Sequence, residues 1–149
     1  MKWIDTPPVW LAIFVVAAYN IGRFQPAGLS FRWGIFDLLA GLLIGGGIVL
    51  MLLAVYEMRR QRTTFIPHRE ADHLVQSGIF KRTRNPIYLG DLMVLSGLVL
   101  RFDAPLALPL IPIFLWLIEK RFVLPEEDRL RRKFRADFAR YCTKTRRWL

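Results

Sequence analysis

The stretch IFDLLAGLLIGGGIVLMLLAVY, residues 35–56, is an apolar run that contains a single charged side chain, Asp37. As a helix, this stretch is long enough to cross the roughly 30 Å hydrocarbon core of a bilayer. Gly41 and Gly45 are four residues apart, which places two small residues on one helix face and would allow another helix to approach closely. The run therefore predicts a membrane-spanning helix.

Three further apolar segments surround this run, at about residues 8–21, 87–100 and 104–118. The last two are shorter than the roughly 20 residues that a perpendicular span needs, but together they return the chain to the side it left. No alternation of strand and helix appears, and no glycine-rich turn follows a strand. We expect an all-α membrane helical bundle of about four transmembrane segments, in a single domain of residues 1–149.

The basic residues are concentrated in two places. The chain has 22 Lys and Arg against 12 Asp and Glu. Seven of the bases lie in residues 57–86 and eleven in residues 119–149, each next to an apolar segment. Such a charge suits nucleic acid as well, but the neighbouring segments favour a lipid bilayer as partner and no nucleic acid. By the positive-inside rule, both basic regions and both termini are expected in the cytoplasm, in a multi-pass protein of the inner membrane.

The tail of the chain reads as one amphipathic helix over residues 125–141. Leu130, Phe134, Phe138 and Tyr141 recur at helical spacing, and the other faces are charged. Two placements fit this pattern. The apolar stripe can lie on the membrane surface, or it can pack on the polar loop that precedes residue 87.

That polar loop ends in a motif that suits an anion. Ser77-Gly78 is a turn signal, and Asn85-Pro86 breaks the chain where the next helix starts. The free amides of this helix start, with Arg82 and Arg84, suit a carboxylate. The alternative is that the bases of the loop face lipid headgroups.

A pair of carboxylates, Glu126 and Glu127, opens the tail helix directly after Pro125. Acidic residues in a first turn are stabilised by the helix dipole, which is one sufficient explanation. The other is that one carboxylate binds the ammonium or ribose of a ligand. Glu119 is a weaker candidate for the same role.

Other ionisable groups give weaker signals. His68 and His73 enclose Glu70 and Asp72, but no further His or Cys completes a set of ligands, so no metal site is predicted. An ionisable group inside a span is a functional candidate. Asp37 and Asp91 lie near segment ends, however, where both are expected to reach water.

Two motifs in this order resemble a known family. The first is Leu74-Val75-x-Ser77-Gly78-x-Phe80-x-x-Thr83-Arg84-Asn85-Pro86-x-Tyr88-Leu89-Gly90, preceded by Thr63-Thr64-x-x-x-Pro67-His68. The second is Glu126-Glu127-x-x-Leu130-x-x-x-Phe134, followed by Tyr141 and Arg147-Trp148. Over roughly residues 40–149 the chain resembles the isoprenylcysteine carboxyl methyltransferases and their relatives, the membrane phospholipid methyltransferases. It departs from their pattern at Asn85, where His is more frequent, at Phe80, where Tyr is frequent, and at Arg135, where Gly often stands.

The resemblance implies a methyltransferase that uses S-adenosyl-L-methionine, with a cytoplasmic cofactor pocket built from motifs at about residues 63–90 and 119–148. It implies catalytic roles for Arg84 and Glu127. The cofactor-binding residues that it implies are Gly78, Phe80, Arg84, Asn85, Pro86, Tyr88, Gly90, Glu126 and Glu127.

The methyl acceptor is expected to be lipophilic and to enter from the bilayer. The first candidate is the carboxylate of an isoprenylcysteine-like molecule, which is ionised already and needs no general base. A phospholipid amine or a small thiol is the alternative, and either would need deprotonation, with Glu127 as the candidate base. Outside enzymes, the remaining alternative is a membrane protein that binds anionic lipid without catalysis.

Overall fold

The computed structural model describes residues 4–26, 28, 34–63 and 73–149. These residues form helices and turns, with no strand among them. In chain order the elements are α1 (Pro7–Phe24), α2 (Gly34–Arg60), the 3₁₀ turn η1 (Gly78–Lys81), α3 (Pro86–Arg101), the 3₁₀ turn η2 (Pro105–Ala107), α4 (Leu110–Ile118), the π-helical turn η3 (Glu119–Val123), α5 (Leu124–Phe134) and α6 (Ala136–Lys144). The all-α class expected from the sequence is confirmed for this part of the chain.

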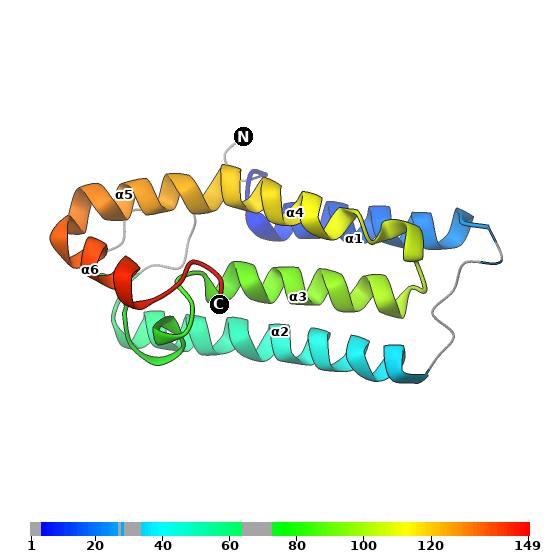
Figure 1. Cartoon of the computed structure of the whole chain (residues 1–149), viewed down its shortest axis with the longest axis horizontal. Coiled ribbons are helices and arrows are strands. Elements are labelled where there is room, and N and C mark those ends of the chain that lie inside the picture. The colour runs from blue at the N-terminus through cyan, green and yellow to red at the C-terminus, as the bar shows by residue number, and fades with distance from the viewer. Residues whose placement is uncertain (1–3, 27, 29–33, 64–72) are drawn as a thin grey trace.

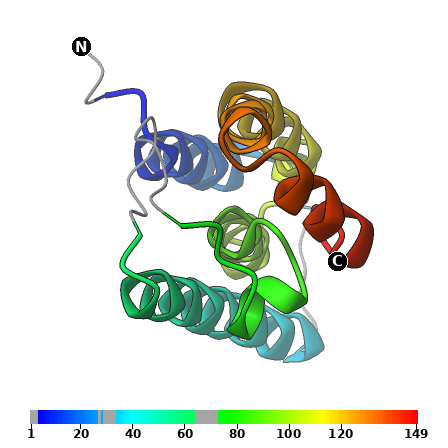
Figure 2. The ribbon, with the colours of Figure 1, turned by 90° about the vertical axis from the view of Figure 1, so that its left-hand side faces the viewer.

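Helix α3 lies at the centre of the bundle, with α2 on one side and α1 and α4 on the other (Figures 1 and 2). Its apolar face packs against α1 and α4 in a core that includes Leu95, Val99 and Phe114. The rings of Phe14 and Phe114 meet edge to face, with their centroids 5.2 Å apart. The element that carries the Asn85-Pro86 motif is thus held from several sides.

Two helices, α1 and α2, are long and apolar enough to cross a membrane. Only 17% of each apolar window is buried inside the protein, so most of these side chains face outward. Helix α3 has 16 residues and α4 has 9, which is shorter than a perpendicular span. The four expected segments all appear as helical elements, and two of them meet the length of a span.

Glycines set the distance between α2 and α3, but they are not the expected ones. A Cβ atom on Gly47 would lie 2.7 Å from the carbonyl oxygen of Gly90, and one on Gly90 would lie 2.7 Å from the carbonyl oxygen of Gly47. Gly41 and Gly45 have nothing within 4 Å of such an atom. Among the described residues, no helix packs closely on Gly41 and Gly45, and close packing of another helix on this pair stays a prediction.

The polar tail continues directly from the last apolar helix. Elements α4, η3 and α5 follow one another without a break from Leu110 to Phe134, and Figure 1 shows them as one long rod. The π-helical turn begins at Glu119, where the apolar sequence ends. A widened turn of this kind often marks a functional position in a helix.

The prediction of one helix over residues 125–141 is wrong, because the tail breaks at Arg135. This residue has φ 42° and ψ −111°, and it separates α5 from α6. The apolar stripe nevertheless persists across the break. Phe138 and Tyr141 are buried against Val75 and Phe80, so the stripe packs on the loop before α3, the second of the two expected placements.

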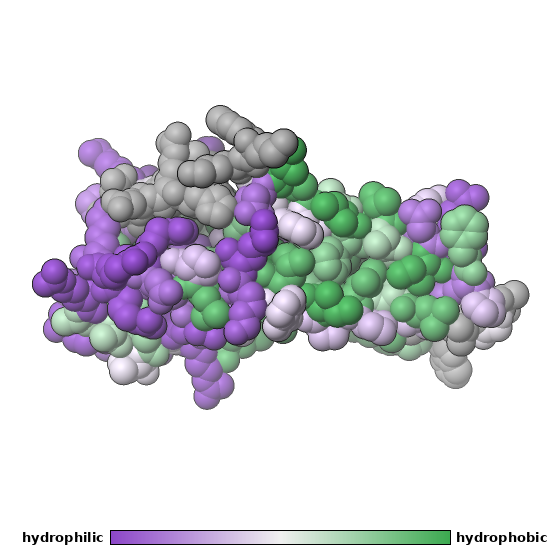
Figure 3. All heavy atoms as spheres, turned by 90° about the horizontal axis from the view of Figure 1, so that it is seen from above, coloured by the Kyte–Doolittle hydropathy of each residue, from purple (hydrophilic) through white to green (hydrophobic). Residues whose placement is uncertain are grey.

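Both described parts of the basic regions lie at one end of the bundle. Figure 3 shows hydrophilic residues gathered around α5 and α6, and hydrophobic residues along the helices beyond them. Near the N-terminus, Asp5 accepts a hydrogen bond of 2.5 Å from Nε of Arg121, which ties the start of the chain to the base of the tail. The chain is thus polarised along its long axis.

Candidate functional site

The loop before α3 is fixed by a buried acid at the end of α2. Glu57 is 4% exposed, and its Oε1 accepts a hydrogen bond of 2.5 Å from the hydroxyl of Ser77. The next residue, Gly78, has φ +60°, which favours glycine, and a Cβ atom there would lie 2.7 Å from Oε2 of Glu57. The Ser77-Gly78 turn is therefore needed for the path of the loop.

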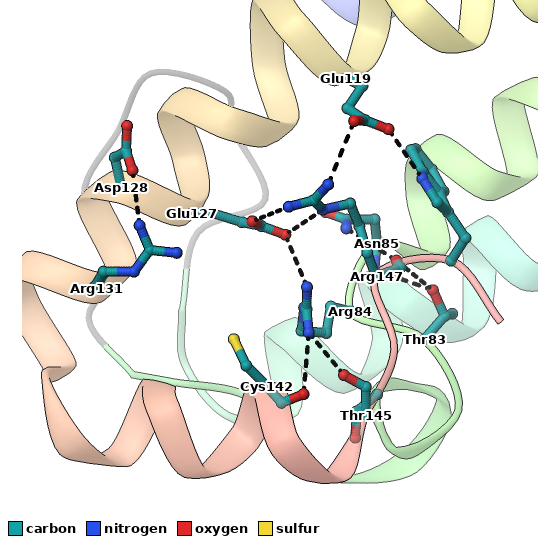
Figure 4. A network of polar contacts seen from close by, with 11 residues as sticks. Thr83, Arg84, Asn85, Glu119, Glu127, Asp128, Arg131, Cys142, Thr145 and Arg147 are labelled. Atoms are coloured by element: carbon teal, nitrogen blue, oxygen red, sulfur yellow. Dashed lines mark hydrogen bonds and ion pairs between the residues drawn. The ribbon is translucent and has the colours of Figure 1, made fainter.

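The centre of the site is a carboxylate shared by two arginines (Figure 4). Glu127 is 5% exposed and accepts from Arg147 twice, Nε to Oε1 and Nη2 to Oε2, both at 2.9 Å. Its Oε1 also accepts from Nη2 of Arg84 at 3.2 Å. Glu127 is thus more than a residue that pairs with the helix dipole, because it joins α5 to the loop and to the C-terminal tail.

These contacts determine the charge states of Glu127 and Arg147. Burial on its own would raise the pKa of Glu127, but the hydrogen bonds and charges of Arg147 and Arg84 outweigh it, and the net pKa lies below the ordinary value. The hydrogen bond to Glu127 in turn raises the pKa of Arg147. Glu127 is therefore a carboxylate at neutral pH and lies between the guanidinium groups of Arg147 and Arg84.

Arg84 is almost fully engaged. Its Nη1 donates to the backbone carbonyl of Thr145 at 2.8 Å and to that of Cys142 at 3.3 Å, while Nη2 binds Glu127. Its Nε is buried and has no hydrogen-bond partner among the residues that the structure describes. Arg84 therefore keeps one N–H that is removed from water and still available to an acceptor.

The C-terminal tail is fastened along the loop. The amide of Arg84 donates to the carbonyl of Arg146 at 3.0 Å. The carbonyl of Arg147 accepts from the hydroxyl of Thr83 at 3.1 Å and from Nδ2 of Asn85 at 3.0 Å. The hydroxyl of Tyr141 donates to the carbonyl of Phe80 at 2.6 Å. Asn85 thus has a defined role, which is to hold the tail at the start of α3.

The π-helical turn contributes a second carboxylate to the cluster. Glu119 accepts from Nη1 of Arg147 at 3.3 Å and from Nε1 of Trp148 at 3.2 Å. Beside it on α3, the phenol of Tyr88 donates to Oε2 of Glu126 at 2.9 Å. The ring of Tyr88 lies 6.4 Å from that of Phe122. The site therefore combines guanidinium groups, carboxylates and aromatic rings.

The structure brings together some of the residues expected at the site and separates others. Arg84, Asn85 and Glu127 share one hydrogen-bonded cluster. Phe80 is instead packed in the apolar cluster beneath α6. Gly90 faces α2, and Gly78 faces Glu57, so both have packing roles. Pro86 is fully buried at the first position of α3.

Sequence reasoning missed Arg147 as a site residue, although it stands in the second motif. It makes more contacts to the carboxylates of the cluster than Arg84 does. The available signal was the place of the Arg147-Trp148 pair in the second of the two motifs.

The expectation that Asp91 reaches water is wrong. Asp91 is 4% exposed, since α3 is covered from several sides, whereas Asp37 on α2 is exposed as expected. His68, Glu70 and Asp72 lie outside the described residues, as do Thr64 and Pro67 of the upstream motif. Over the part of the chain that the structure describes, no group of three metal-ligating side chains occurs.

Comparison with known proteins identifies a family for most of the chain. Residues 36–137 match the model of the phospholipid methyltransferase family. The matched region runs from the start of α2 into α6 and includes Arg84, Tyr88 and Glu127. No curated protein and no solved structure matches the chain.

Proposed function

The chain belongs to the phospholipid methyltransferase family, whose members are membrane methyltransferases, and on this premise we propose that it transfers a methyl group from S-adenosylmethionine to a lipophilic acceptor. The observation that carries the proposal is the unpartnered Nε of Arg84, buried in a cluster of fixed charges. A buried N–H without a partner costs free energy, and a ligand carboxylate would restore the missing bond.

The residues present fit this cofactor. Its amino acid end carries a carboxylate and an ammonium group. Arg84 would bind the carboxylate through Nε, assisted by the free amides at the start of α3. Glu119 and Glu126 border the same cluster and would accept from the ammonium. The faces of Tyr88 and Phe122 suit the sulfonium or the adenine.

Glu127 would act mainly on the two arginines. Both of its oxygens already accept from Arg147, and Oε1 also accepts from Arg84. A carboxylate held in this way keeps Arg84 in one orientation, so that its free N–H points in a fixed direction. When bound, the cofactor supplies an electrophilic methyl group, and the main tasks of the protein are to position the acceptor and exclude water.

Helices α3 and α4 would complete the four membrane segments, with both termini in the cytoplasm. The two basic regions support this orientation, because 18 of the 22 bases lie there. Reporter fusions after Arg62 and after Leu149 should both report a cytoplasmic location. Finding them on opposite sides would contradict the arrangement.

The acceptor would enter from the bilayer along the exposed apolar helices. The three acceptor classes under consideration are a prenylcysteine carboxylate, a phospholipid amine and a small thiol. The alternative of a non-catalytic protein that binds anionic lipid is less well supported. Arg84 and Arg147 are committed to carboxylates inside the protein and do not extend toward headgroups.

The proposal is tested by methyl transfer. Detergent-solubilised protein is mixed with methyl-labelled S-adenosylmethionine and, in separate reactions, with a prenylcysteine, phosphatidylethanolamine and a lipophilic thiol. We expect label in the lipid phase with at least one acceptor, and its loss in Arg84→Ala. Arg82→Ala is the matched control, because Arg82 is an exposed base of the same loop. Equal transfer by wild type and Arg84→Ala would contradict the assignment of the site.

A further inference from the structure

Asp91 is a buried acid in the second turn of α3. It is 4% exposed, and its Oδ2 is buried without a hydrogen-bond partner among the described residues. An ionised carboxylate in such a place is strongly disfavoured unless a partner compensates it. The contacts of the folded chain therefore do not explain why an acid occupies this position.

Asp91 lies on the same helix as Tyr88, a residue of the candidate site. Asp91 follows Tyr88 by three residues, so the two side chains point within about 60° of each other on the helix. The phenol of Tyr88 donates a hydrogen bond of 2.9 Å to Oε2 of Glu126. Asp91 is about 7 Å along α3 from Pro86, at a rise of 1.5 Å per residue. It thus lies further along α3 from the Asn85-Pro86 start than Tyr88 does.

We propose that Asp91 receives the protonated amino group of the methyl acceptor and takes the proton that this amine must lose before it can be methylated. The inference rests on the methyl transfer proposed above, and it selects a lipid amine from the three acceptor classes.

The chemistry of the step balances. The ammonium group of the acceptor donates one proton to Oδ2 of Asp91, which leaves a neutral amine with a lone pair. That nitrogen attacks the methyl carbon, a carbon–nitrogen bond forms, and the carbon–sulfur bond breaks with its electron pair staying on sulfur. The methylated ammonium product and S-adenosylhomocysteine leave, and Asp91 releases its proton to water.

The other two acceptor classes suit this position less well. A carboxylate acceptor would bring a second negative charge to Asp91 in a place removed from water, where like charges repel strongly. A thiol is neutral and offers a single weak donor to the carboxylate. An ammonium group matches both the charge and the hydrogen-bonding capacity of the buried oxygen.

The test compares Asp91→Asn with Asp37→Asn, which makes the same change at an exposed acid of α2. Transfer to phosphatidylethanolamine and to S-farnesylcysteine is measured for each protein, together with thermal stabilisation by S-adenosylhomocysteine. We expect Asp91→Asn to lose at least about tenfold in kcat/KM for phosphatidylethanolamine, the scale of one lost charged contact. We expect its stabilisation by S-adenosylhomocysteine, and the activity of Asp37→Asn, to match wild type.

A second measurement uses the wild-type protein alone, so it does not depend on how the variant folds. Unlabelled phosphatidylethanolamine and S-farnesylcysteine compete for labelled methyl groups, and the amine should be methylated in preference. Unchanged amine methylation in Asp91→Asn would overturn the inference. Preferential methylation of S-farnesylcysteine, the carboxylate acceptor, would also overturn it. A loss of affinity for S-adenosylmethionine with unchanged affinity for S-adenosylhomocysteine would overturn it as well, because Asp91 would then face the sulfonium.

The failure of this inference can be told apart from failure of the proposed function. A wild-type protein that neither binds S-adenosylhomocysteine nor methylates any acceptor would overturn both. A wild-type protein that binds it and methylates S-farnesylcysteine in preference would overturn the role of Asp91 alone.

Discussion

Arg147 and Glu127 form a bidentate ion pair in which Nε and Nη2 each donate to a different carboxylate oxygen at 2.9 Å. The pair closes a loop of twenty residues that contains α6, and it brings the C-terminal tail back to the start of α3. Parallel N–H···O bonds of this kind fix orientation as well as distance. The tail is therefore part of the site, and the order of the site depends on this pair.

Removing the charge of Glu127 should destabilise the protein. Glu127→Gln leaves the guanidinium of Arg84, only 12% exposed, without its anionic partner. Breaking a buried ion pair from one side costs about 3 kcal/mol. We expect this loss in the free energy of unfolding, measured by SDS titration of detergent-solubilised protein. Asp128→Asn is the control, because that acid and its partner Arg131 are both more than 60% exposed, and it should change stability by less than about 0.5 kcal/mol.

The same pair predicts how stability depends on pH. The pKa of Glu127 is lowered in the folded state, so its contribution is present above the ordinary value of 4.5 and is lost as the pH falls through the lower folded-state pKa. Wild type should therefore lose more stability than Glu127→Gln between pH 5 and pH 3. An identical acid profile for the two proteins would remove Glu127 as the responsible group.

Deleting residues 145–149 should abolish cofactor binding. The deletion removes Arg147 and the carbonyl groups that accept from Thr83, Asn85 and the amide of Arg84. Three hydrogen bonds at about 1 kcal/mol each correspond to roughly 100-fold or more in affinity for S-adenosylhomocysteine. Isothermal titration calorimetry would measure this loss of affinity. Deletion of Leu149 alone, which is 75% exposed, should leave affinity unchanged.

Arg135→Gly should stabilise the protein. Arg135 has φ 42°, a conformation that costs a non-glycine residue on the order of 1 kcal/mol and costs glycine little. We expect a gain of about 0.5–1 kcal/mol, read from the unfolding midpoint. Arg132→Gly, an exposed position inside α5, should have the opposite sign and lose about 1 kcal/mol. If both substitutions destabilise equally, the break in the tail is not strained.

Gly47→Ala should weaken the packing of α2 on α3. The added methyl group would lie 2.7 Å from the carbonyl oxygen of Gly90, so the two helices must separate. Overpacking of this kind costs about 1–3 kcal/mol. Gly41→Ala, where nothing lies within 4 Å, should be neutral or slightly stabilising, because alanine favours helix. Equal stability of the two variants would contradict the close contact.

The sequence was most informative where local pattern decides structure. The apolar runs at residues 35–56 and 87–100 lie inside α2 and α3, and Asn85-Pro86 marks the start of α3 as expected. These features depend on the hydrophobicity and backbone geometry of neighbouring residues. The apolar stripe of the tail was also visible, because helical spacing persists on both sides of Arg135.

What depends on distant contacts could not be predicted. The burial of Asp91 follows from the helices around α3, whereas its place near the end of an apolar segment suggested contact with water. The roles of Gly47 and Gly41 differ only by which face of α2 meets α3. The arginine that binds Glu127 most closely is 20 residues away, so only the folded tail identifies Arg147.

The central claim is that the cluster around Arg84 binds S-adenosylmethionine, and binding of S-adenosylhomocysteine to wild type, Arg84→Ala, Arg84→Lys and Arg82→Ala tests it most directly. Arg84→Lys keeps the charge but removes the buried Nε donor. We predict that wild type and Arg82→Ala bind equally, as measured by isothermal titration. Both Arg84 variants should lose about 30- to 150-fold in affinity, the equivalent of 2–3 kcal/mol for a charged hydrogen bond. No binding by wild type, or equal affinity in all four proteins, would contradict the claim.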